Sequence, residues 1–86
     1  MHVTDAYKAL TEQGKRRALR GIAALLTAEK LNTNQDEVRA IVTGGTVLAR
    51  LSNSDVARTI SGYFRGQIGM DVGPDEVLSR NSNAGE

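Results

Sequence analysis

The sequence predicts a mainly α-helical fold, a small domain of about four helices. Two observations favour this fold. Apolar and small residues recur at steps of three and four from Val3 to Ala28, which places them on one helical face. Short polar residues that typically cap helices precede later apolar segments, at Asn34 and Ser54. The alternative is an α+β fold with one β-hairpin at residues 38–51.

The composition is that of one small domain. The 86 residues are 40% hydrophobic and 24% charged, and they include two tyrosines, one phenylalanine, no tryptophan and no cysteine. We expect a single domain at residues 1–80 and a flexible polar tail at residues 81–86. Such a chain buries a small core, with few aromatic side chains and no disulfide to add stability. Burial of surface against a second copy is therefore expected, in a homodimer.

Features that the sequence lacks argue against several classes of protein. Without cysteine, the chain has no disulfide, no thiol nucleophile and no cysteine-ligated metal. The first residues do not form a basic and then apolar signal segment, and no apolar run approaches the about 18 residues of a membrane span. We expect a cytoplasmic protein without membrane contact.

The first helix is predicted from Thr4 to Lys30, with Thr4 as its N-cap and Asp5 as an acid in its first turn. Gly14 is its weak point, because a glycine inside a helix costs about 1 kcal/mol relative to alanine. Either the helix breaks near Gly14 or this glycine permits close packing.

The segment VRAIVTGGTVLARL at residues 38–51 has two interpretations. Its sequence is nearly mirrored about Gly44 and Gly45, and a glycine pair suits the type I′ turn of a hairpin. The helical interpretation rests on Asn34 and Glu37, which have the spacing of a capping box, and on Gly44 as a C-terminal glycine. We favour the helix slightly, because a two-stranded ribbon needs other residues to cover it.

A further helix is predicted from Ser54 to Gln67, closed by Gly69, and a last short helix begins at Pro74. Gly62 and Gly66 lie one turn apart on the same side of the Ser54 helix. Small residues at that spacing let another backbone approach closely.

The residues that catalysis needs are few. His2 is the only histidine and lies at the N-terminus, and Asp36, Asp55 and Asp75 fall in predicted first turns, where helix dipoles account for them. The sequence has no Ser-His-Asp set, no phosphate-binding glycine loop followed by lysine, and no metal-ligand spacing. We expect no enzyme activity, no cofactor and no metal.

Positive charge is concentrated in the first thirty residues, whereas the last seventeen carry an acidic excess. The segment KRRALR places Arg16 and Arg20 one turn apart, and Arg58 and Arg65 share one side of the Ser54 helix. Guanidinium groups bind phosphate in a bidentate manner. The predicted nucleic-acid-binding residues are Lys15, Arg16, Arg17, Arg20, Arg58 and Arg65. The alternative is a solvated helix face with pairs such as Lys8 and Glu12.

Two functions follow from these patterns. The first is a small non-catalytic accessory or regulatory protein that binds nucleic acid as a dimer, through a basic helical face. The second is a protein–protein adaptor or a homo-oligomeric assembly subunit that does not bind nucleic acid. In either case the predicted oligomer interface comprises Gly14, Ala18, Gly21, Gly62, Gly66 and Phe64.

Overall fold

The computed structural model describes residues 1–31, 33–44 and 53–77, and within these ranges it contains helices and no strand. Its elements are α1 (Val3–Lys8), α2 (Glu12–Ala28), α3 (Gln35–Gly44), α4 (Asn53–Tyr63) and the π-helix η1 (Phe64–Ile68). The prediction of a mainly α-helical fold is confirmed. The predicted polar tail at residues 81–86 lies outside the described residues.

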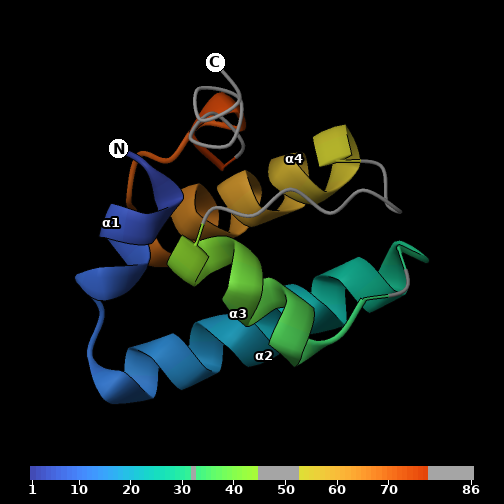
Figure 1. Cartoon of the computed structure of the whole chain (residues 1–86), viewed down its shortest axis with the longest axis horizontal. Coiled ribbons are helices and arrows are strands. Elements are labelled where there is room, and N and C mark those ends of the chain that lie inside the picture. The colour runs from blue at the N-terminus through green and yellow to red at the C-terminus, as the bar shows by residue number, and fades with distance from the viewer. Residues whose placement is uncertain (32, 45–52, 78–86) are drawn as a thin grey trace.

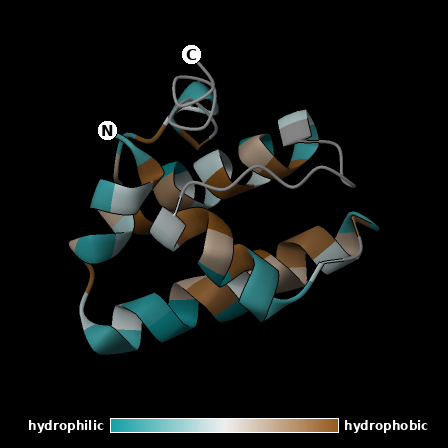
Figure 2. Ribbon diagram, viewed as in Figure 1, coloured by the Kyte–Doolittle hydropathy of each residue, from teal (hydrophilic) through white to brown (hydrophobic). Residues whose placement is uncertain are grey.

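Helix α2 has 17 residues and is the longest of the described elements. Helices α3 and α4 both pack against α2, α1 packs against α3, and η1 continues α4 (Figure 1). The apolar side of each helix turns toward the interior, as the hydropathy colouring of Figure 2 shows. The largest side chains that are fully buried there are Phe64, Ile22, Leu26, Ile41 and Ile60. Val3, Ala6 and Tyr7 of α1 are buried in the same cluster, so the core draws on all five elements.

The prediction of one helix over residues 4–30 is wrong, because the chain forms two helices with a break between Lys8 and Glu12. Thr11 is the N-cap of α2, and its Oγ1 accepts a hydrogen bond from the backbone N–H of Gly14 at 3.0 Å. Gly14 thus lies in the first turn of α2 and not at the break. A Cβ at Gly14 would lie 3.1 Å from Thr11 Oγ1, so the glycine leaves room for the cap.

Helix α1 begins earlier than predicted, because its N-cap is His2 and not Thr4. The His2 Nδ1 atom accepts from the backbone N–H of Thr4 at 3.2 Å and lies 2.9 Å from the Thr4 hydroxyl. Thr4 itself is buried inside the helix, 5% exposed. The N-terminal histidine, for which the sequence predicted no role, therefore satisfies a helix-end donor.

Helix α3 shows that the helical interpretation of the glycine-pair segment is correct up to Gly44. The backbone N–H of Glu37 donates to Asn34 Oδ1 at 3.0 Å, as the capping-box spacing predicts. Val38, Ile41 and Val42 are buried on one side of α3, at helical and not alternating spacing. The hairpin alternative is wrong for residues 38–44, and residues 45–51 lie outside the described residues.

Helix α4 begins at Asn53, close to the predicted start, but its last turn is wider than predicted. The N–H groups of Gly69 and Met70 both donate to the carbonyl oxygen of Phe64, at 2.8 and 3.0 Å. The first of these bonds spans five residues, as in a π-helix. Gly69, at φ +83°, ends η1 in the left-handed region, so the prediction that Gly69 closes this helix is confirmed.

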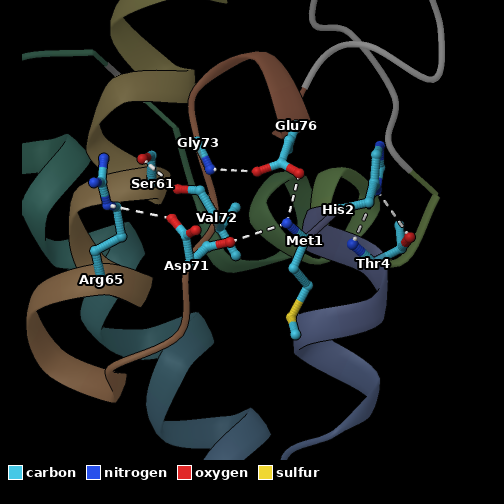
Figure 3. A network of polar contacts seen from close by, with 9 residues as sticks. All are labelled: Met1, His2, Thr4, Ser61, Arg65, Asp71, Val72, Gly73 and Glu76. Atoms are coloured by element: carbon cyan, nitrogen blue, oxygen red, sulfur yellow. Dashed lines mark hydrogen bonds and ion pairs between the residues drawn. The ribbon is translucent and has the colours of Figure 1, made fainter.

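The segment after η1 returns to α1 through polar contacts (Figure 3). The Ser61 hydroxyl donates to the carbonyl oxygen of Val72 at 2.6 Å, and this pair is buried. The amine of Met1 donates to the Asp71 carbonyl at 3.0 Å and pairs with Glu76 Oε2 at 2.5 Å. Pro74 precedes a helical turn at residues 75–77, where the described part ends. These contacts fasten the two ends of the described chain to each other.

The Glu76 carboxylate makes stability depend on pH. Its ion pair with the N-terminal amine, together with the backbone N–H of Gly73, holds the pKa of Glu76 below its ordinary value of 4.5. A lowered pKa means that this stabilisation is present above pH 4.5 and is lost as the pH falls through the lowered value. We expect Glu76→Gln to lower the melting temperature at pH 7 and to have a smaller effect at an acidic pH below the lowered pKa, where wild-type Glu76 is protonated. A melting-temperature difference that is the same at both pH values would contradict the pairing.

Candidate nucleic-acid interface

The exposed face of α2 carries three arginines, Arg16, Arg17 and Arg20, all of which are exposed. Their direction follows from the helical period, because Ala18 and Ile22 are buried against the core. The arginines occupy the remaining, outward arc of the same turns. Because an arginine side chain keeps its charge at all physiological pH values, this arc is permanently cationic.

These three arginines differ from the other predicted phosphate ligands in having no acidic partner among the described residues. Among the described residues, none of the three forms an ion pair, whereas each of the other three predicted cations does. The pairs are Lys15 with Glu12 at 3.5 Å, Arg58 with Asp55 at 3.2 Å and Arg65 with Asp71 at 3.9 Å. The charge of Arg16, Arg17 and Arg20 is therefore uncompensated locally, and an anion from outside can approach it.

The predicted nucleic-acid ligands come from three elements, α2, α4 and η1. The Lys15 ammonium group lies 5.7 Å from the centre of the Tyr7 ring, so it takes part in packing between α2 and α1. Arg58 lines a groove between α2 and α4, and Arg20 lines a shallow groove with residues at the start of α3. Arg65 belongs to η1. The three α2 arginines thus share one helix, whereas Arg58 and Arg65 belong to α4 and η1.

The predicted interface residues have mixed positions. Ala18 and Phe64 are 1% and 0% exposed inside the domain, so contacts within the chain account for their burial. Gly21 packs against Tyr63, because a Cβ there would lie 2.7 Å from Tyr63 Cε2. Of the other members, Gly14 serves the α2 cap, whereas Gly62 and Gly66 are exposed, and a Cβ at either would meet no atom within 4 Å. Sequence spacing alone could not separate these cases.

The aromatic residues all take part in packing. Tyr7 and Phe64 are buried, 8% and 0% exposed. Tyr63 is half-buried, contacts Phe64 edge to face at 6.4 Å between ring centres, and rests against Gly21. Base stacking on a protein requires an exposed aromatic ring. None of the three rings is fully exposed, because Tyr7 and Phe64 are buried and Tyr63 is partly covered by Gly21.

Other kinds of site find no support in residues 1–31, 33–44 and 53–77. No group of three or more histidine, aspartate or glutamate side chains is arranged there to hold a metal ion. No helix in the same part of the chain has both the length and the apolar character needed to cross a bilayer. Compared with known protein families, curated proteins and solved structures, the sequence matches none of them.

Proposed function

We propose that this chain is a non-catalytic accessory or regulatory protein that binds the phosphate backbone of double-stranded nucleic acid through Arg16, Arg17 and Arg20. The observation that carries the proposal is the absence of an acidic partner for these three exposed arginines among the described residues, while Lys15, Arg58 and Arg65 have one. A cation that already holds a carboxylate gains less from a phosphate, because it must first give up that carboxylate.

The dimensions of the arginine face suit backbone contacts. Arg16 and Arg20 are four residues apart, which corresponds to about 6 Å along the helix axis. A single strand of B-form DNA advances about 3.4 Å per phosphate, so this distance spans about two successive phosphates. Phosphate contacts of this kind carry no direct sequence information. We therefore expect binding that depends strongly on salt and weakly on sequence.

The burial of the aromatic rings favours a duplex over a single strand. Proteins that hold single strands without sequence preference stack bases on exposed aromatic side chains. Here Tyr7, Tyr63 and Phe64 are engaged in packing within the domain. A duplex needs no stacking platform, because its phosphates alone supply the attraction.

The test is a fluorescence-anisotropy titration of a labelled duplex and a labelled single strand of equal length. We expect the duplex to bind more tightly, and the logarithm of its association constant to fall with the logarithm of the salt concentration with a slope of about −3, one unit for each arginine. No binding of either probe at low salt would refute the proposal. Tighter binding of the single strand would refute the duplex assignment.

A protein–protein adaptor or assembly subunit remains the second candidate, and a separate part of the surface supports it. Gly62 is exposed in a groove that also contains Leu25, which is 41% exposed and apolar. Of these two functions, only the first predicts duplex binding with a salt dependence.

A further inference from the structure

A groove of about 510 Å³ lies between the second half of α2 and the start of α3, two helices that pack against each other (Figure 1). Arg20, one of the three proposed phosphate ligands, lines this groove. The other lining residues are small or polar and carry no charge: Ala23, Ala24, Thr27, Thr33, Asn34 and Gln35. The arginine face of α2 therefore borders a groove whose remaining lining residues are neutral.

The side of α2 that carries Arg16 and Arg20 continues to Thr27. A helix turns by about 100° for each residue, so the directions of these three residues lie within about 40° of one another around the axis. All three side chains are exposed. The distance along the axis is about 16 Å from Arg16 to Thr27, compared with about 6 Å from Arg16 to Arg20. A nucleic-acid strand that follows this side of α2 beyond the arginines therefore enters the groove.

Gln35 is the residue of the α3 wall that is best suited to bind a further phosphate. Thr33 and Asn34 already stabilise the start of α3: the Thr33 hydroxyl donates to Glu37 Oε1 at 2.9 Å, and Asn34 Oδ1 accepts from the backbone N–H of Glu37 at 3.0 Å. The exposed Gln35 side chain has no hydrogen-bond partner in the described part of the chain. Its amide NH₂ group can donate to a phosphate oxygen.

We propose that one strand of the bound duplex continues from Arg16 and Arg20 along the groove between α2 and α3, where the Gln35 amide donates to one of its phosphates. This inference rests on the proposed function, because the arginines supply the attraction for the duplex. The positive charge of Arg20 at the groove attracts the phosphates. Ala23 and Ala24 have short side chains, which let the strand approach the α2 backbone.

Two acidic residues follow Gln35 in the first turn of α3, and neither lines the groove. They are Asp36 and Glu37. Asp36 is turned by about 100° from Gln35 around the helix axis. Because these carboxylates repel phosphate, they favour a path on the side of α3 that carries Gln35.

The first test adds a positive charge at the groove. Gln35→Arg places a guanidinium group beside the proposed strand, whereas Gln67→Arg adds the same charge at an exposed position of η1 outside this groove. Fluorescence anisotropy with the labelled duplex measures the affinity over a range of salt concentrations. We expect Gln35→Arg to steepen the salt slope by about one unit, because one more phosphate is neutralised, and Gln67→Arg to leave the slope nearly unchanged.

The second test weakens the groove without any change of charge. Gln35→Ala should lower the affinity for the duplex about fivefold, because a hydrogen bond to a charged group is lost. Ala24→Leu should lower it about tenfold, because the larger side chain occupies the path of the strand. Both variants should keep the wild-type salt slope, since no phosphate loses a cation. The controls Gln67→Ala and Ala40→Leu, at exposed positions of η1 and α3 outside this groove, should bind as the wild type does.

The outcomes separate this inference from the proposed function. Circular dichroism checks that every variant keeps its helices. A wild-type chain that does not bind the duplex overturns the proposed function and this inference together. If the wild type binds with the expected salt slope but the Gln35 variants behave like the Gln67 variants, the strand does not follow the groove, and this inference alone is overturned. Equal affinities of Ala24→Leu and Ala40→Leu overturn it as well.

Discussion

Phe64→Ala is expected to unfold a large share of the protein at room temperature. Phe64 is fully buried and is the largest such side chain in the described core. Removal of a buried phenylalanine ring costs about 3–5 kcal/mol, through lost transfer energy and the cavity that remains. The total stability of a small domain is about 5–15 kcal/mol, and a chain with so small a core belongs near the lower limit.

The expected loss of stability comes from the Phe64 ring and not from its backbone. Its carbonyl oxygen accepts the two N–H groups that close η1, and alanine keeps that carbonyl. The ring packs edge to face against Tyr63, which in turn rests on Gly21 of α2. Loss of the ring therefore removes a packing partner of Tyr63, the residue that contacts Gly21 of α2.

Urea denaturation followed by circular dichroism measures this effect. Phe64→Leu is the graded control, because it keeps most of the volume and should cost less than about 1.5 kcal/mol. The expected order of stability is wild type, then Phe64→Leu, then Phe64→Ala. A loss below about 1 kcal/mol for the alanine variant would contradict the central place of this ring in the core.

The features that the sequence predicted correctly are local. The Asn34 cap with Glu37 and the closure by Gly69 each depend on residues within about five positions of one another. The same is true of the outward direction of Arg16 and Arg20, which follows from the helical period and the apolar neighbours. Such features need no knowledge of the rest of the fold.

The errors have a physical cause as well. The apolar pattern runs without interruption through Tyr7 and Leu10, so it does not reveal that Thr11 ends one helix and begins the next. The Thr11 hydroxyl accepts the N–H of Gly14 and so begins a new helix, and Leu10, just before it, packs against the core. The period of the apolar residues indicates which side of a helix is buried. It does not indicate where a side chain caps the helix by a hydrogen bond to the backbone.

The candidate interface was the least predictable part. Rows of small residues look alike whether they pack within the chain, as Ala18 and Gly21 do, or remain exposed, as Gly62 does. Contacts that distinguish these cases join residues far apart in the sequence. The hydrogen bond from Thr59 to Glu29 spans thirty positions, and no local sequence pattern predicts it.

A triple variant that replaces Arg16, Arg17 and Arg20 by glutamate is expected to abolish duplex binding at physiological salt. Each substitution removes a phosphate contact and adds a repulsion, so a loss of at least about a hundredfold in affinity is expected at low salt. The side chains are exposed and have no acidic partner among the described residues, so each change should alter stability by less than about 0.5 kcal/mol. The fold therefore survives, and anisotropy titration reports the site itself.

A second triple variant, with glutamine at positions 16, 17 and 20, distinguishes binding at the α2 arginines from attraction by the net charge of the protein. It should flatten the salt dependence by about three units of slope, since each lost phosphate contact removes about one. The matched control replaces Arg39, Arg58 and Arg65 by glutamine, which removes the same charge from exposed positions on α3, α4 and η1. Because two of these arginines already hold a carboxylate, we expect the control to keep most of the affinity and of the slope. Equal losses in the two variants would show that the chain attracts nucleic acid through its total charge, and the α2 face would then not be the site.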